Sequence, residues 1–128
     1  IRQDFPGGWD SDKNNAFRKE GRTPEQQQFF DFSSQLFTWR KSNDAVHFGK
    51  MKHYLPENNV YVYFRYTDSK SVMVVVNNNT ESQTFPTNRF KESILNYTTG
   101  NEVLTGKSID LKNDIAIEGK SVLILELK

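Results

Sequence analysis

The chain has no cysteine among its 128 residues, and this absence removes disulfide bonds, thiolate nucleophiles and cysteine-based zinc sites together. It also lacks a long hydrophobic run, because no stretch approaches the roughly 20 apolar residues that a membrane-spanning helix needs. Net charge is small as well: 17 Lys plus Arg against 16 Asp plus Glu leave +1, and no segment concentrates the basic residues. Neither a nucleic acid nor a membrane is therefore an expected partner.

The usual signatures of catalysis and cofactor binding are missing too. The sequence shows no Ser/His/Asp set, no P-loop and no GxGxxG, so we expect no cofactor. The two histidines, His47 and His53, flank a strand-like stretch and would lie about 20 Å apart, too far to share a metal. The first residues do not have the charged-then-apolar layout of a signal peptide, so the bacterial periplasm and the cytoplasm both stay open.

Aromatic residues, by contrast, are plentiful: ten Phe, five Tyr and two Trp occur beside a mean hydropathy of -0.74. This combination predicts an aromatic-rich core inside a very polar shell. The length is that of one ordinary domain, which can bury such a core without disulfides or a structural metal.

One strong helix signal lies in the first third of the chain. Thr23 is a good N-cap, Pro24 suits the first helical position, and Gln26 completes a capping box with Thr23. We therefore predict an amphipathic helix from Pro24 to Ser42. Its apolar residues fall within one half of the cylinder: Phe29, Phe30, Phe32, Leu36, Phe37 and Trp39.

After Asn43 the pattern changes to the alternation that is typical of strands. The candidate strands are AVHFGKM, NVYVYFRY, SVMVVVN, QTF, a weaker ILNY, NEVL, SIDL, DIAIE and SVLILEL. SVMVVV is apolar on both faces and should be central, while TDSK and Glu118-Gly119-Lys120 are predicted hairpin turns. The sequence thus predicts a mostly β fold, an antiparallel Greek-key β-sandwich preceded by one long amphipathic α-helix and an irregular N-terminal loop.

That loop, RQDFPGGWDSD, raises the question of a metal or catalytic site. Asp10, Asp12 and Asn14 follow the D-x-D-x-N spacing of a calcium loop, but Asn15 stands where such a loop needs glycine and Gly21 where it needs glutamate. We therefore expect no metal site, and these residues are better explained as caps of a short helical turn.

Carboxylates and aromatics remain as candidates for sugar chemistry. Asp4 lies in the Gly/Pro loop next to Arg2, where an ion pair or a turn hydrogen bond is a simpler role than catalysis. Tyr61, Tyr63 and Trp39 could stack on sugar rings, although aromatics at strand or helix spacing usually belong to a core.

Several segments together resemble one known family. The runs RQDFPGGWDSDKNNAF, GRTPEQQQFFDFSSQLFTWRKSNDAVHFGKMKHYLP, VYVYFRY and VMVVVNNN resemble the C-terminal part of alpha-amylase family enzymes (glycoside hydrolase family 13). Neopullulanase and cyclomaltodextrinase types look most similar, particularly the Bacteroidetes-like ones. The family pattern has a D-x-PGG-[WF] loop, then NAF and GRT segments, then a WRK-x-x-x-A-x-x-x-GK passage, which correspond here to 4–9, 15–17, 21–23 and 39–50.

The resemblance implies two parts. Residues 1–44 correspond to the end of the catalytic barrel, with its last loop and last helix, and residues 45–128 to the β-sandwich called domain C. The family's catalytic Asp, Glu and second Asp lie in barrel segments that this sequence does not contain, so no catalytic role carries over to any residue. By resemblance, Asp4 and Trp9 would line the outer rim of the sugar cleft in a complete enzyme.

The expected function follows from that correspondence. The resemblance implies a non-catalytic accessory domain of an α-glucan-hydrolysing glycosidase, with the missing barrel as its partner and the glucan reached only through the parent. Two alternatives are a carbohydrate-binding module for maltooligosaccharides and a free-standing β-sandwich interaction protein. The helix face with Phe29, Phe32 and Leu36 would lose its barrel partner in this chain, and self-association is one way to cover it.

Overall fold

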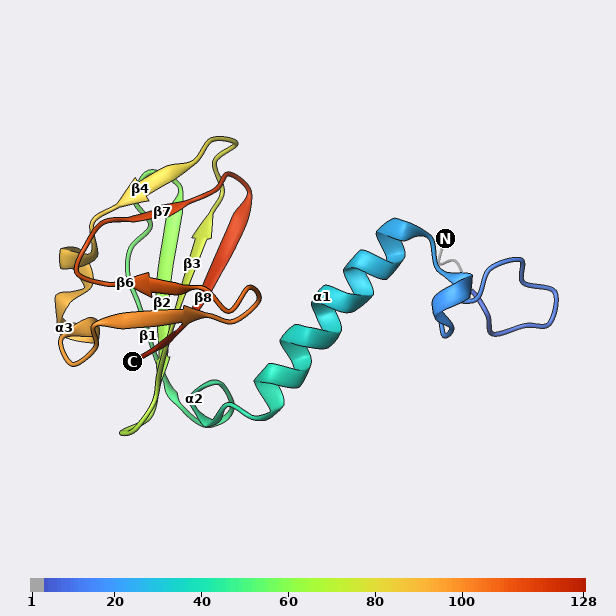
Figure 1. The fold of residues 1–128 in the computed structure, drawn as a ribbon, viewed down its shortest axis with the longest axis horizontal. Helices are drawn as coiled ribbons and strands as arrows, with labels where there is room; N and C mark the ends of the chain where they lie inside the picture. Colours follow the sequence, from blue (N-terminus) through green and yellow to red (C-terminus); the bar gives the residue numbers. More distant parts are fainter. Residues whose placement is uncertain (1–3) are drawn as a thin grey trace. The chain divides into compact units, whose positions relative to one another are not determined.

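The computed structural model describes residues 4–128, which divide into two compact units at the boundary between Phe37 and Thr38. Figure 1 shows the elements of the chain and labels most of them. They are η1 (Lys19–Gly21), α1 (Pro24–Lys41), α2 (Asp44–His47), β1 (Lys50–His53), β2 (Val60–Tyr66), β3 (Ser71–Asn77), β4 (Gln83–Phe85), η2 (Thr87–Phe90), α3 (Lys91–Ile94), β5 (Thr99–Glu102), β6 (Ser108–Asp110), β7 (Ile115–Ile117) and β8 (Ser121–Leu127). Within 4–128, no helix has both the length and the apolar character needed to cross a membrane.

Helix α1 begins where the capping signal predicts. The backbone N–H of Thr23 donates to Gln26 Oε1 at 2.9 Å, and the N–H of Gln26 donates to Thr23 Oγ1 at 3.3 Å. This is the reciprocal arrangement of a capping box, which satisfies two amides that the first helical turn leaves without partners. The helix ends at Lys41, one residue before the predicted Ser42.

Two predicted strands are wrong, because short helices take their places. The side chain of Asn43 accepts a hydrogen bond from the N–H of Val46 at 3.4 Å and caps α2, so AVHFGKM is not a strand and β1 begins only at Lys50. The weaker candidate ILNY overlaps the end of α3 instead. Both helices have four residues, too few to establish a helical period in the sequence.

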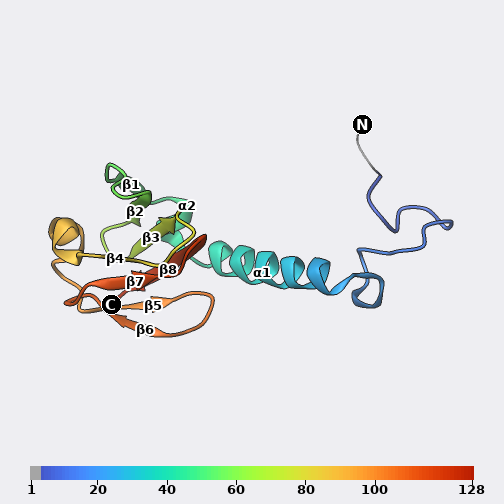
Figure 2. The same ribbon diagram turned by 90° about the horizontal axis from the view of Figure 1, so that it is seen from above.

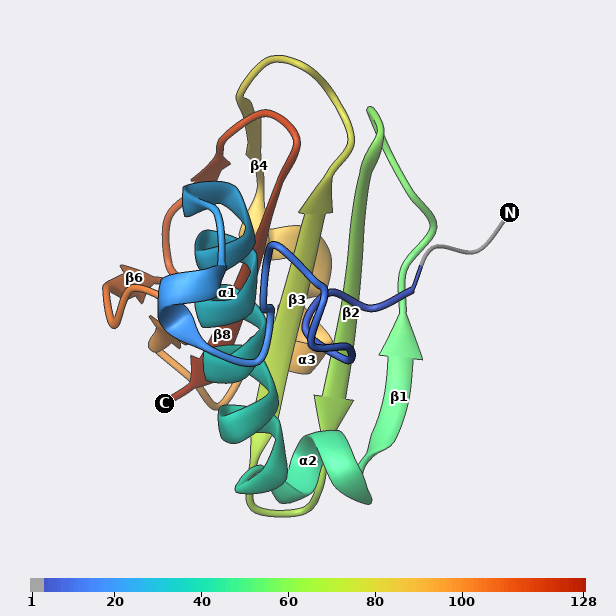
Figure 3. The same ribbon diagram turned by 90° about the vertical axis from the view of Figure 1, so that its right-hand side faces the viewer.

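A six-stranded antiparallel sheet has the order β1-β2-β3-β8-β5-β6, which can be followed from β1 to β6 in Figure 2. β3 pairs with β2 on one side and β8 on the other, and Figure 3 shows these strands together. The predicted central position of SVMVVV is therefore confirmed. The turn between β2 and β3 is also as predicted, with the N–H of Thr67 donating to the carbonyl of Lys70 at 2.9 Å.

β4 and β7 form a separate two-stranded sheet. This arrangement corrects the second predicted hairpin: Glu118-Gly119-Lys120 joins β7 of the small sheet to β8 of the large one, so the two strands do not pair with each other. The turn carries the chain from one layer of the sandwich to the other.

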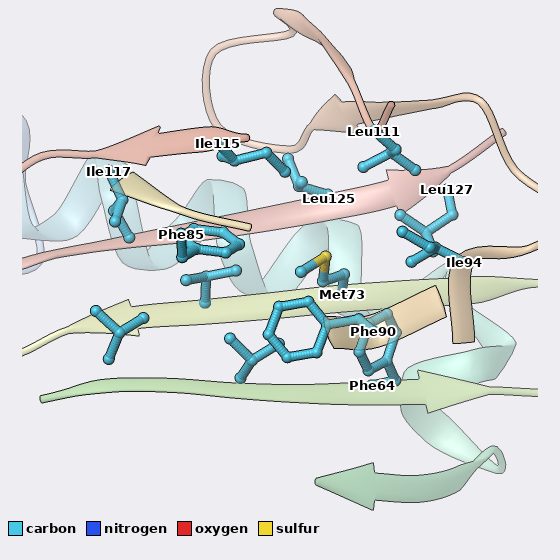
Figure 4. Packing of buried hydrophobic residues seen from close by; sticks show 13 residues of the cluster. Phe64, Met73, Phe85, Phe90, Ile94, Leu111, Ile115, Ile117, Leu125 and Leu127 are labelled. Carbon is cyan, nitrogen blue, oxygen red and sulfur yellow. The ribbon is translucent and has the colours of Figure 1, made fainter. Parts of the chain in front are cut away.

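The hydrophobic core lies between the two sheets and beneath η2 and α3 (Figure 4). Phe64, Met73 and Leu125 come from the large sheet, and each is at most 1% exposed. Residues that pack against them come from the small sheet and the helical segment: Phe85, Ile115, Ile117, Phe90 and Ile94. The predicted mostly β antiparallel sandwich with an aromatic core is therefore confirmed.

Candidate functional site

The two predicted rim residues, Asp4 and Trp9, are both exposed, and the Trp9 side chain is 67% accessible. The loop that carries Trp9 is shaped by Asp12, whose Oδ2 accepts hydrogen bonds from the N–H groups of Gly7 at 2.8 Å and Trp9 at 3.2 Å. Gly7 has a φ of +98°, a conformation that favours glycine. Arg2, the possible ion-pair partner of Asp4, lies outside the described residues.

The D-x-D-x-N stretch uses its side chains for turns. Asp12 caps the loop amides as described, and Asn15 Oδ1 accepts from the N–H of Phe17 at 2.9 Å. Across residues 4–128, no three acidic or imidazole side chains gather in a way that could hold a metal ion. His47 lies in α2 beside Phe48 and His53 in β1 beside Tyr61, so the histidines occupy different elements.

The NAF and GRT segments, separated by three residues in a turn-rich stretch, are joined by Arg22. Its Nε donates to the carbonyl of Ala16 at 2.7 Å, Nη1 donates to Gln27 Oε1 at 3.0 Å, and the guanidinium lies 3.6 Å from the Phe30 ring centre. A Cβ at Gly21 would overlap the backbone of Asn15, so only glycine allows this close approach. The residues that carry the family resemblance thus make one local structure at the start of α1.

The apolar face of α1 is exposed: no residue of this helix is buried, and Phe29 is 74% accessible. Phe30, Phe32 and Phe37 are 41–56% accessible. An open groove of about 490 Å³ lies where the N-terminal segment borders the first turns of α1. Its apolar lining residues are Phe5, Pro6, Ala16, Phe29 and Phe30.

In the second unit, the segment 39–50, from WRK to GK, is hydrogen-bonded to the large sheet. Trp39 Nε1 and Asn43 Nδ2 both donate to Glu126 Oε1 on β8, at 2.7 and 2.8 Å. Arg65 on β2 donates to the carbonyl of Ala45 at 3.3 Å. Trp39 therefore serves as a hydrogen-bonded anchor for the last turn of α1.

Tyr61 and Tyr63 lie on the face of β2 that points away from the core, with ring centres 5.7 Å apart. Both are half-buried. Burial raises the pKa of the Tyr63 phenol, with a further contribution from Tyr61, while Arg65 opposes the rise. These rings form a surface patch beside His53.

A polar hollow of about 300 Å³ lies where β2 and β3 approach their connecting turn and α3 covers them. The Nζ of Lys52 lies 2.7 Å from Glu92 Oε1, which also accepts from the Tyr54 hydroxyl at 3.0 Å. The hydrogen bond from Lys52, followed by that from Tyr54, lowers the pKa of Glu92, and the same bond raises the pKa of Lys52. The sequence did not predict this hollow, because its lining residues come from segments far apart in the chain, including β1, β2, β3 and α3. The one signal in the sequence was Ser71, a polar residue at a strand position that faces inward.

Several solved structures have a similar fold. A variant of AmyP in complex with maltotriose matches with a TM-score of 0.70 at 19% identity, over 83% of this chain and 22% of that one. An Anoxybacillus alpha-amylase matches with a TM-score of 0.64 at 16% identity, over 84% and 26%. A variant of MutB in complex with sucrose matches with a TM-score of 0.66 at 20% identity, over 89% and 20%. The similar part is thus about a quarter or less of each of those chains.

At these identities the solved structures establish the fold alone. The family is established by the sequence itself: residues 51–126, more than half of the chain, match the profile of the cyclo-malto-dextrinase C-terminal domain. This segment begins within β1 and ends within β8, so it includes part or all of every strand among the described residues. The chain therefore belongs to the cyclo-malto-dextrinase C-terminal domain family.

Proposed function

We propose that this chain is the non-catalytic C-terminal accessory part of an α-glucan-hydrolysing enzyme and that it stabilises the catalytic barrel of that enzyme. The family match and the fold similarity to an alpha-amylase support this role. The finer assignment to a neopullulanase or cyclomaltodextrinase type, of Bacteroidetes-like origin, belongs to the same proposal and rests on the sequence segments 4–9, 15–17, 21–23 and 39–50.

The observation that carries the proposal is the exposed apolar face of α1. A helix of this length gains most of its stability by packing an apolar face against a neighbour, yet Phe29 is 74% accessible and no residue of α1 is buried. A face rich in phenylalanine is what a helix needs to pack against the outside of a barrel. In the proposed parent, that barrel is the neighbour.

In this assignment residues 1–44 are the end of the barrel and residues 45–128 are the accessory domain. The loop from Asp4 to Trp9 would then leave the last barrel strand at the face where barrel enzymes bind substrate, with both side chains at the rim. The carboxylates that cleave the glycosidic bond belong to the barrel of the parent, and this chain contributes support.

The test is to change the apolar face within the parent enzyme. Phe29→Asp with Phe32→Asp is expected to lower the Tm of the parent by several degrees, because two aromatic side chains would be lost from a buried contact at about 3 kcal/mol or more each. Ser34→Asp, on the polar side of the same helix, is the matched control and should leave the Tm nearly unchanged.

The same variants in the 128-residue chain complete the experiment. The stability of the Thr38–Lys128 unit should be unaffected, since neither phenylalanine belongs to its core. A parent whose Tm is as insensitive to the Phe29 and Phe32 changes as to Ser34→Asp would contradict the proposed packing of α1.

A further inference from the structure

The outward face of the large sheet carries three cross-strand rows on the neighbouring strands β2, β3 and β8 (Figure 3). Alternate residues of these strands belong to the core, so the residues between them face outward. By register, the rows are Arg65, Val72 and Glu126; then Tyr63, Val74 and Ile124; and then Tyr61, Val76 and Val122. Charged side chains occur only in the first row, and the other two rows are apolar or aromatic.

The first row is occupied by the segment that leads from α1 into β1. Glu126 accepts hydrogen bonds from Trp39 and Asn43. Arg65 donates to the carbonyl of Val46 at 3.0 Å. Both charged side chains of this row therefore have partners within the chain, and the row serves to hold the entry of α1 on the sheet.

The third row, farthest from this segment, is still in contact with solvent. Val76 is 36% exposed, and Tyr61 and Val122 are partly exposed. An antiparallel sheet face that meets water normally carries polar residues in alternation with the core residues. Valine and aromatic side chains on three adjacent strands are instead typical of a face that another body covers.

The composition of the second and third rows indicates the chemistry of that body. None of their six side chains is charged, so a charged partner surface would lose its hydration without gaining an ion pair. The Tyr61 and Tyr63 rings, 5.7 Å apart, add a large aromatic area whose hydroxyls can still reach polar groups at its edge. The rows therefore fit an apolar protein surface with hydrogen-bonding groups at its margin.

The entry of α1 indicates which protein surface this is. A C-terminal domain is preceded by the rest of its enzyme, and similar folds make up about a quarter or less of the solved chains. The preceding chain reaches the sandwich through α1, whose Trp39 is bonded to Glu126 on this same face. The preceding part of the parent thus joins the sandwich on the side of the open rows.

We propose that the second and third rows form a docking surface for the catalytic barrel of the parent. The identity of the barrel rests on the proposed function, whereas the surface is a feature of the sandwich alone. In that assignment α1 is itself the last barrel helix, so its phenylalanines pack within the barrel. The outward rows would then be the contact through which the sandwich itself stabilises the barrel.

The first test compares Val76→Arg in the parent and in the 128-residue chain. Docking would bury the new charge without a partner, so the Tm of the parent is expected to fall by several degrees. In the 128-residue chain the same position is open to water, and the Tm should change little. Leu95→Arg is the matched control, because Leu95 is 70% exposed beside α3, which covers the inward side of the sheet, and should leave both Tm values nearly unchanged.

The second test needs no variant. Hydroxyl-radical oxidation followed by mass spectrometry is expected to modify Tyr61 and Tyr63 several-fold more slowly in the parent than in the 128-residue chain, while Leu95 keeps its rate. Equal tyrosine rates in the two proteins would overturn the proposal. Protection of Tyr61 that appears in the 128-residue chain as its concentration rises would also overturn it, since the rows would then join two copies of the chain.

These outcomes are separable from those of the proposed function. A parent that is destabilised by the Phe29 and Phe32 changes but not by Val76→Arg would keep its assigned barrel helix and lose the docking surface. A parent that is insensitive to all of these changes would contradict both proposals.

Discussion

At the scale of single residues, Asn77 does most to connect the two layers of the sandwich. It is 1% exposed, and its Nδ2 donates to the carbonyls of Glu81 at 3.0 Å and Glu118 at 2.9 Å. Its Oδ1 accepts from the N–H of Asn79 at 2.9 Å. A single amide side chain thus holds the loop after β3 against the crossover from β7 to β8.

Asn77→Ala is expected to lower the free energy of unfolding by about 2 kcal/mol or more, because it leaves several buried backbone groups without partners. The measurement is urea unfolding followed by tryptophan fluorescence. Asn88→Ala, at an exposed position of η2, is the matched control and should change the free energy of unfolding by less than about 0.5 kcal/mol. Equal effects of the two substitutions would show that the Asn77 network contributes little.

Asn77 also illustrates what sequence alone could not supply. A buried asparagine in an apolar strand looks like a break in the pattern, and only the crossover brings the carbonyls of Ile117 and Glu118 to it. The same holds for the polar hollow, which Ser71 at the start of β3 lines together with residues of α3. Local pattern shows that such residues are unusual, whereas contacts between distant segments show why they are there.

At the scale of elements, prediction succeeded where a local signal was complete. The capping box of Thr23 and Gln26 fixed the start of α1, and β4 and β8 match QTF and SVLILEL residue for residue. It failed at α2 and α3, where four-residue helices carry too little periodicity to be separated from strands. The hairpin predicted at 118–120 failed because turn residues do not reveal which strand will be the partner.

Helix α1 should respond in opposite directions to two threonine substitutions. Thr23→Ala removes the cap and is expected to cost the helix about 1 kcal/mol, whereas Thr38→Ala, at an exposed position of the helix, replaces a β-branched residue with a better helix former. Far-ultraviolet circular dichroism at increasing temperature measures both. Thr23→Ala should reduce helical signal at lower temperature and Thr38→Ala should preserve it; changes of the same sign would contradict the capping role of Thr23.

At the scale of the whole molecule, the two units differ in how they are stabilised. The Thr38–Lys128 unit contains the entire hydrophobic core cluster, while α1 has no buried residue. Cooperative unfolding depends on a shared core, so the two units are not expected to unfold with the same temperature dependence.

A Trp9→Phe chain leaves Trp39, which is bonded to Glu126, as the single tryptophan reporter of the second unit. Its fluorescence is expected to follow one sigmoidal transition. The helical circular dichroism signal should begin to fall at lower temperature and over a broader range, since α1 frays without a packed face. Coincident curves from the two probes would show that the helix and the sandwich are one cooperative body.

The position of β8 has a consequence for protein synthesis. Residues 121–127 lie between β3 and β5, so the large sheet is divided until this segment has emerged from the ribosome. Throughout that interval β3, the most buried strand of the large sheet, presents one unpaired edge to the surroundings. The translating chain therefore passes through a period of aggregation risk that ends only when β8 is added to the nascent sheet.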